Sequence, residues 1–140
     1  LRMWEFTMKQ LLGLVLACLM MAPAMADETW DTEYGLVIFE RGLGDVAILS
    51  YPVDKGRLGS VYFPGLAGNY DNRSVHEGYW IEDGPGSCMV EIVGADGRRS
   101  NNWGRAIIAF DRPAFPTGWT ALGGDCFGAP DSPLRGDLPL

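Results

Sequence analysis

Short apolar or aromatic runs alternate with clusters of glycine, proline, aspartate and asparagine along most of this chain. Short strands separated by such turn residues at this spacing are typical of an all-β sandwich or barrel. After the first 26 residues no window keeps the i, i+3, i+4 spacing of an amphipathic helix. The pattern predicts strands over residues 34–39, 46–51, 57–63, 77–81, 88–93, 104–110 and 118–122, with a further run near 68–70.

Glycines inside the expected strands favour a barrel over a sandwich. Gly59, Gly78 and Gly104 would weaken a flat sheet, but glycine suits the bends and close backbone approaches of a barrel wall. Full closure also removes the exposed strand edges that promote aggregation. The sequence therefore predicts a small antiparallel up-and-down barrel of the lipocalin or avidin type, with a β-sandwich as the alternative. The segment 95–97, which contains Asp-Gly, predicts a hairpin with a type I′ turn.

The first 26 residues have the pattern of a cleaved export signal. Met8-Lys9-Gln10 forms a short basic start, residues 11–21 form an apolar run, and Ala24-Met25-Ala26 has the small-x-small pattern that signal peptidase reads. The apolar run is shorter than the roughly 20 residues that span a bilayer. We expect translation to begin at Met8 and cleavage to follow Ala26, which gives a secreted or periplasmic protein with no membrane insertion after cleavage.

Two further consequences follow from this processing. Residues 27–127 should form a single β domain, and residues 128–140, which are rich in proline and glycine, should be a loosely ordered tail.

The alternative to cleavage after Ala26 is a lipoprotein acylated at Cys18. Leu16 is large for that motif, and the apolar residues 19–21 would follow the acylated position, so plain secretion is the favoured interpretation.

The charge of the chain argues against polyanionic partners. Its 11 Lys and Arg residues against 18 Asp and Glu residues give a formal net charge of −7, and removal of the leader makes the chain slightly more acidic. The basic residues are scattered, so the counterion release that drives nucleic-acid binding is not available. An anionic lipid surface would repel the protein as well.

The cysteines predict a disulfide in an oxidising compartment. Cys18 leaves with the leader, and Cys88 and Cys126 remain as an even pair. Neither has a second cysteine or a histidine at ligand spacing, and the chain has a single histidine, His76. We therefore expect no metal site and no cofactor.

Several motifs together resemble a set of small exported bacterial β proteins of uncharacterised function with a tryptophan and glycine signature. They are Trp30-Asp31-Thr32-Glu33-Tyr34-Gly35, Gly56-Arg57-Leu58-Gly59, Gly78-Tyr79-Trp80-Ile81-Glu82, Trp103-Gly104-Arg105 and Phe115-Pro116-Thr117-Gly118-Trp119, together with the two later cysteines. The resemblance covers most of residues 27–127. It implies a β-barrel and an exported location, and it implies no activity.

Catalytic motifs do not stand out in this sequence. His76 and Glu77 are neighbours, and on a strand they would point to opposite faces; His76 is expected to be an exposed loop residue. There is no Gly-x-Ser-x-Gly elbow and no phosphate-binding glycine loop. Carboxylates are too common here for any pair to indicate a glycosidase. We expect a protein that is not an enzyme.

Tryptophans are the best clue to function. Trp30, Trp80, Trp103 and Trp119 lie in or beside expected strands, and most of them should pack in the core. A barrel can also hold an apolar or saccharide ligand in an aromatic pocket. The ligand-binding candidates are Trp80, Glu82, Trp103 and Trp119, with Trp80 as the best because Gly78, Trp80 and Glu82 share one face.

The sequence therefore predicts an exported, non-enzymatic binding or interaction module whose partner is a small apolar or saccharide ligand, or a protein. Two alternatives remain. The first is an inhibitor of an extracellular hydrolase, in which residues 27–30 project from the barrel and plug an active site. The second is a structural protein of the cell envelope.

Overall fold

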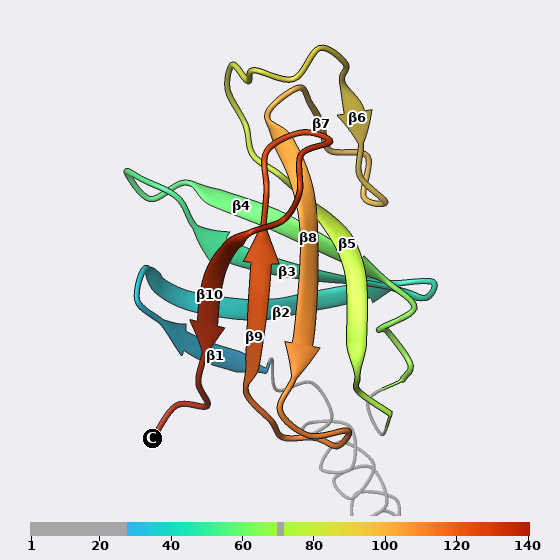
Figure 1. Ribbon diagram of the computed structural model, residues 1–140, viewed down its shortest axis with the longest axis vertical. Coiled ribbons are helices and arrows are strands. Elements are labelled where there is room, and N and C mark those ends of the chain that lie inside the picture. The colour runs from blue at the N-terminus through green and yellow to red at the C-terminus, as the bar shows by residue number, and fades with distance from the viewer. Residues whose placement is uncertain (1–27, 70–71) are drawn as a thin grey trace, which may run out of the picture.

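The computed structural model describes residues 28–69 and 72–140 (Figure 1). Within these ranges the chain forms strands and no helix, so the described part holds no helix suited to crossing a membrane. The expected signal peptide and its cleavage site lie outside the described residues. The strands are β1 (Thr29–Thr32), β2 (Gly35–Leu43), β3 (Val46–Pro52), β4 (Leu58–Pro64), β5 (Val75–Ile81), β6 (Ile92–Val93), β7 (Arg99–Ser100), β8 (Trp103–Phe110), β9 (Trp119–Gly123) and β10 (Ser132–Gly136).

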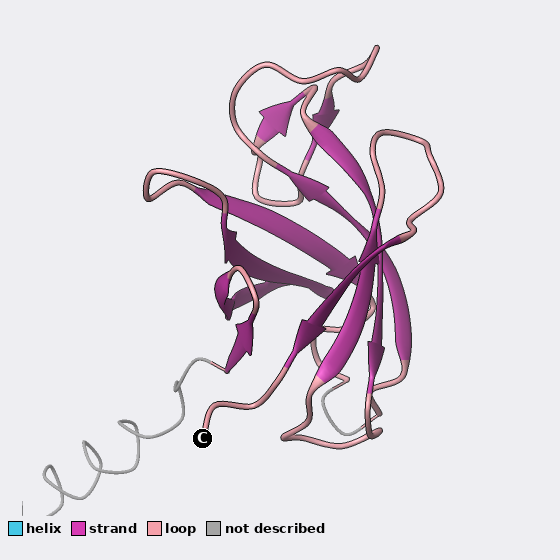
Figure 2. Ribbon diagram, turned by 60° about the vertical axis from the view of Figure 1, so that its left-hand side comes forward, coloured by secondary structure: helices cyan, strands magenta, loops and turns pink. Residues whose placement is uncertain are grey.

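Eight of these strands form one antiparallel sheet in the order β1-β2-β3-β4-β5-β8-β9-β10. Each strand pairs with the next along the chain, except that the hairpin β6–β7 is inserted between β5 and β8. In Figure 1 the strands β2–β4 run across β8–β10, and the β6–β7 excursion projects beyond one end of the sheet. The sheet curls until β10 approaches β1, as Figure 2 also shows. The predicted all-β, up-and-down barrel is therefore confirmed, in a nearly closed form.

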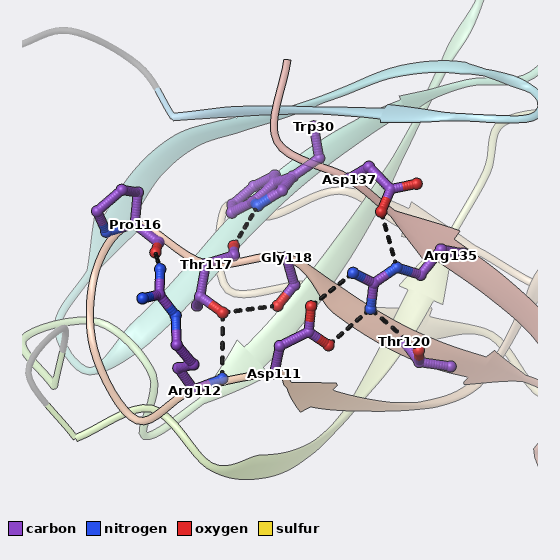
Figure 3. Close-up of polar contacts among 9 residues, drawn as sticks. All are labelled: Trp30, Asp111, Arg112, Pro116, Thr117, Gly118, Thr120, Arg135 and Asp137. Atoms are coloured by element: carbon purple, nitrogen blue, oxygen red, sulfur yellow. Dashed lines mark hydrogen bonds and ion pairs between the residues drawn. The ribbon is translucent and has the colours of Figure 1, made fainter. Parts of the chain in front are cut away.

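Closure depends on one short contact between the first and last strands. Asp31 and Asp137 exchange two backbone hydrogen bonds, with N···O distances of 2.8 and 2.9 Å. Near this bridge the indole N–H of Trp30 donates to the carbonyl of Thr117 at 2.9 Å (Figure 3). The seam between β1 and β10 is thus joined at one point and not along the full length of the two strands.

The C-terminal segment differs from the loosely ordered tail that the sequence suggested. Residues 132–136 form β10, which pairs with β9 from Ser132 opposite Gly123 to Gly136 opposite Trp119. An end strand of a sheet tolerates Pro133, because a missing N–H there need not break a central ladder. Leu134 packs against the interior of the barrel. Long-range pairing and burial supply an order that local composition did not indicate.

Three local expectations also need correction. In the run near 68–70, residue 68 ends a turn over 65–68 and residue 69 belongs to no strand, while residue 70 lies outside the described residues. The expected strand 88–93 is reduced to the two residues of β6, because residues 88–91 have no partner strand. The predicted hairpin is present, but only Gly97 has a positive φ (86°), and its N–H donates to Gly94. A type I′ turn needs positive φ at both central residues.

Alternate side chains along the strands fill two apolar clusters on opposite faces of the sheet. In β3, Ala47 and Leu49 belong to the cluster inside the barrel, while Ile48 belongs to the cluster outside it. In β4, Phe63 lies inside and Tyr62 outside. The buried members of the interior cluster are Trp30, Val37, Ala47, Leu49, Phe63, Leu66, Ala106, Ile108 and Trp119.

The outer cluster joins the barrel wall to the β6–β7 excursion. Its buried members are Ile48, Tyr62, Ile81, Cys88 and Trp103. Cys88 forms a disulfide with Cys126, with a Cα–Cα distance of 5.5 Å, and so ties the excursion to the β9–β10 connection. The predicted disulfide is confirmed. The hydroxyl of Tyr62 donates to Asp96 at the hairpin tip at 2.8 Å, which fixes the excursion from its other side.

The start of β1 is held by a buried ion pair. The Arg73 guanidinium donates to both carboxylate oxygens of Glu28 at 2.8 and 2.7 Å, and the Arg73 side chain is only 2% exposed. The same guanidinium lies 5.0 Å from the ring centroid of Phe110. The Glu28 carbonyl also accepts the N–H of Phe39 at 2.8 Å. Residues 28–32 are therefore part of the barrel wall.

Candidate functional site

The interior of the barrel is not completely filled. A cavity of about 280 Å³ lies between the strand group β2–β5 and the strand group β8–β10. Its inner wall consists of side chains from the interior cluster, namely Val37, Leu49, Phe63, Ala106, Ile108 and Trp119. This volume is near the lower end of the roughly 300–1,000 Å³ of small-molecule sites, which indicates a small ligand.

The cavity reaches the surface beside the seam. Among its lining residues Tyr34, Ser132 and Pro133 are exposed, and they come from the β1–β2 turn and from the first half of β10. The bridge between Asp31 and Asp137 lies at the other end of β10. The incomplete pairing of β1 with β10 therefore leaves an opening in the wall, bordered by an aromatic ring and a proline.

Trp80, the best ligand-binding candidate from the sequence, lines the cavity from β5. It is half-buried, whereas Trp30, Trp103 and Trp119 are 1%, 4% and 2% exposed. Its indole N–H donates to the carbonyl of Gly124 at 2.8 Å, so the ring is fixed at one edge. Trp80 packs against the interior cluster and is available to a ligand as well.

Gly104 makes room for this indole. Trp80 and Gly104 are paired across β5 and β8, and a Cβ on Gly104 would lie 2.4 Å from Nε1 of Trp80 and 1.8 Å from the oxygen of Gly124. Gly104 was expected to allow a close approach in the barrel wall, and here it allows the Trp80 indole and the Gly124 backbone to come close to β8. Gly78 also makes a close backbone approach: a Cβ there would lie 1.9 Å from the carbonyl oxygen of Tyr62, so Gly78 packs against β4 and does not line the cavity.

Glu82 brings one charged group to the cavity. It follows the end of β5 and lines the cavity with Tyr51, whose hydroxyl donates to Glu82 Oε2 at 2.8 Å. Burial, and after it the nearby Glu82 carboxylate, raise the pKa of the Tyr51 phenol far above its usual value. The phenol therefore stays protonated and remains a hydrogen-bond donor to the carboxylate.

Trp119 carries an unsatisfied donor. Its side chain lines the cavity and is 2% exposed, and its indole N–H has no hydrogen-bond partner among the described residues. Its ring meets that of Trp30 edge to face, with centroids 5.9 Å apart. A buried donor without a partner costs about 1–3 kcal/mol, so a ligand that supplied an acceptor would recover part of this cost.

Trp103 does not line the cavity. It is paired with Ile81, which puts its side chain on the outer face of β8, where it belongs to the outer cluster. Its indole N–H donates to Val90 in the excursion at 2.8 Å, and its ring meets Phe127 edge to face. The structure thus brings together Trp80, Glu82 and Trp119 and separates Trp103 from them.

Sequence reasoning missed Tyr51, although a signal was present. Residues 47, 49 and 51 alternate with 48 and 50, and a period of two puts Tyr51 on the same face as the buried Ala47 and Leu49. His76 was also misplaced. It lies within β5 and not in a loop, and it is half-buried, with its ring and that of Phe110 in an edge-to-face arrangement.

A wider hollow lies at the seam, but three of its charged residues already pair with one another. It measures about 590 Å³ and includes Asp111, Arg135 and Asp137. The Arg135 guanidinium donates to Asp111 at 2.6 and 2.5 Å and to Asp137 at 3.0 Å (Figure 3). The Arg135 hydrogen bonds hold the pKa of Asp111 below its usual value. Because these charges satisfy one another, we place the candidate site in the smaller, apolar cavity.

Comparisons of this chain with protein-family models, with curated proteins and with solved structures find no match.

Proposed function

We propose that this protein is an exported, non-enzymatic binding module that holds one small, mainly apolar ligand inside its barrel. The observation that carries the proposal is the interior cavity that collects Trp80, Glu82 and Trp119. Small-molecule sites are typically concave and apolar, with a few polar groups that orient the ligand. Here those groups are the Tyr51–Glu82 pair and the unpartnered N–H of Trp119.

The lining favours an apolar ligand over a saccharide. Aliphatic and aromatic side chains make up most of the wall, and few polar groups are within it. A saccharide would bury many hydroxyls without partners, at a cost of about 1–3 kcal/mol for each. An apolar body gains about 25 cal/mol for each Å² of surface that it removes from water.

A binding role fits this cavity better than hydrolysis does. Glu82 is the only charged side chain among the described residues that line it. Glycoside hydrolysis by paired carboxylates needs a second carboxyl group within about 5–10 Å across the substrate. No observation favours the hydrolase-inhibitor alternative in the form considered from the sequence, since Trp30 is buried and Glu28 is paired with Arg73.

Export is supported by the disulfide and by the leader pattern. A Cys88–Cys126 bridge is expected to persist in an oxidising compartment. Intact-mass analysis of the exported protein should give a chain that begins at Asp27 and carries no lipid. A diacylated species that begins at Cys18 would overturn this part of the proposal.

The binding part is tested with a neutral apolar dye, N-phenyl-1-naphthylamine, whose emission rises in an apolar site. We expect saturable binding with one site per chain and displacement by small apolar molecules. Trp80→Ala should abolish the response. It should cost less stability than the roughly 3–5 kcal/mol expected for a fully buried tryptophan, because Trp80 is half-buried.

Trp103 offers a matched control. Trp80→Phe and Trp103→Phe each remove one indole and one N–H···O=C hydrogen bond of 2.8 Å, but only Trp80 lines the cavity. Trp80→Phe should weaken dye binding roughly tenfold, which corresponds to about 1.4 kcal/mol. Trp103→Phe should leave the dissociation constant unchanged. Equal effects of the two substitutions would refute the proposal, and so would a wild-type protein that binds neither this dye nor any small apolar molecule in a saturable way.

A further inference from the structure

The cavity holds one formal charge, and this charge has no ionic partner. Among the described lining residues only Glu82 is charged. One of its carboxylate oxygens accepts the Tyr51 hydroxyl at 2.8 Å, and the other, Oε1, accepts no hydrogen bond from the described part of the chain. A carboxylate beside an apolar cavity thus keeps one acceptor for a molecule that enters.

The neighbouring arginines form no ion pair with this carboxylate. Arg57 forms its ion pair with Asp54 at 2.5 Å, and Arg98 forms its own with Asp83 at 3.3 Å. Arg98 also donates to Ser60 at 2.7 Å and to the carbonyl of Leu58 at 2.9 Å. Both guanidinium groups are therefore occupied outside the cavity, and Glu82 forms no ion pair within the described residues.

A neutral ligand would leave this carboxylate in an unfavourable state. When an apolar body fills the cavity it displaces water from Oε1, and a charged acceptor that loses water without gaining a donor is destabilised. A protonated amine replaces the lost water with a charge-assisted hydrogen bond, which is stronger than a neutral one. The lining also contains five aromatic rings, and aromatic side chains stabilise cations near them.

From this geometry we propose that the ligand is a small apolar amine, whose ammonium group binds Glu82 and whose hydrocarbon or aromatic body fills the cavity. This inference rests on the proposed binding function and specifies its ligand class. Tyr51 acts as a positioning residue, because its hydroxyl holds Glu82 Oε2 and leaves Oε1 for the ligand. The acidic net charge of −7 would further favour the approach of a cation.

The test uses three probes of nearly equal shape and different charge: 2-phenylethylamine, 2-phenylethanol and 3-phenylpropionate. Isothermal titration calorimetry with the oxidised protein measures the dissociation constant of each. We expect the amine to bind roughly tenfold more tightly than the alcohol, and the carboxylate to bind more weakly than both. This comparison uses the wild-type protein alone, so it remains decisive even where a variant does not fold.

Glu82→Gln then isolates the charge. The Gln carbonyl still accepts the Tyr51 hydroxyl, so the side chain keeps its place while the formal charge is removed. The amine should lose its advantage over the alcohol in this variant. Glu91→Gln is the matched control, because Glu91 is an exposed residue that pairs with Arg99 and does not line the cavity. It removes the same net charge and should leave the preference for the amine intact.

The outcomes separate the two proposals. If the alcohol binds as tightly as the amine, or if Glu82→Gln and Glu91→Gln behave alike, the amine inference is overturned while the binding function remains. If none of the probes and no neutral dye binds the wild-type protein, the binding function itself is wrong, and the inference is lost with it.

Discussion

Gly104 allows the sharpest test of how the barrel holds Trp80. In Gly104→Ala the new Cβ would lie 1.8 Å from the carbonyl oxygen of Gly124 and 2.4 Å from Nε1 of Trp80. The first contact is with backbone, so a change of side-chain rotamer cannot relieve it. The adjacent chain is also restrained, because the N–H of Cys126 donates to Trp103 and its sulfur is in the disulfide.

The cost can be estimated from two contributions. Overpacking of a well-packed site costs about 1–3 kcal/mol. Loss of the hydrogen bond from Trp80 to Gly124 costs about 1 kcal/mol more. The unfolded chain is more restricted with alanine than with glycine, which offsets about 0.4–1 kcal/mol. We therefore expect Gly104→Ala to lower the free energy of unfolding by about 1–4 kcal/mol.

Gly123→Ala is the matched control on the neighbouring strand. A Cβ on Gly123 would have no heavy atom within 4 Å, and the φ of Gly123 is not positive. The same substitution should therefore leave stability unchanged or raise it by up to about 1 kcal/mol. Urea unfolding followed by far-ultraviolet circular dichroism measures both variants, and equal m-values would show that the same surface is exposed. If the two variants differ by less than about 0.5 kcal/mol, the packing argument is wrong.

Three further predictions concern the disulfide, a tyrosine and the last strand. Replacing Cys88 and Cys126 together by serine should lower the free energy of unfolding by about 4 kcal/mol, since the bridge closes a loop with a sequence separation of 38; a loss below about 1 kcal/mol in urea unfolding would contradict this. The raised pKa of Tyr51 stabilises the fold fully below the ordinary pKa of about 10, and this stabilisation declines as the pH rises above it, because the unfolded chain releases the proton first. Between pH 9 and pH 11 the free energy of unfolding should therefore fall less steeply in Tyr51→Phe than in the wild-type protein. Above pH 10 the two slopes should differ by up to about 1.4 kcal/mol per pH unit. If the urea midpoints of the two proteins depend on pH in the same way, this prediction is wrong. Deletion of residues 132–140 should abolish cooperative unfolding and the near-ultraviolet dichroism signal, because it removes β10 and the bridge to Asp31; a deletion variant with wild-type spectra would show that closure is dispensable.

Local patterns in the sequence were sufficient for the fold class and for the burial of most of the tryptophans. Runs such as 46–51 and 104–110 have the length and the alternation of apolar residues that are typical of half-buried strands. The glycines between such runs argue against long helices. The same alternation put Trp80 and Glu82 on one side of the chain, and both line the cavity. The disulfide followed from the even number of cysteines that remain after the expected leader.

The pairing of strands that are distant in sequence decided which side chains face the cavity and whether the C-terminal segment is ordered. Trp80 of β5 lies opposite Gly104 of β8, and the next pair along the same two strands is Ile81 and Trp103. Successive residues of a strand face opposite sides of the sheet, so Trp80 lies inside the barrel and Trp103 lies outside it. A shift of one residue reverses every side chain on a strand, and no local pattern specifies that choice. The order of β10 likewise comes from pairing with β9 and not from its own composition.

The sequence by itself determined an acidic, strand-rich domain with a disulfide, because composition, alternation and cysteine count act locally. Only the tertiary structure decided that β10 meets β1 at a single bridge, that a cavity remains beside that seam, and that the carboxylate of Glu82 lines it with Tyr51 as its donor. These features depend on how the sheet curls and on which side chains from seven different strands converge, since cavity walls and hydrogen-bond partners form only when the distant strands pair.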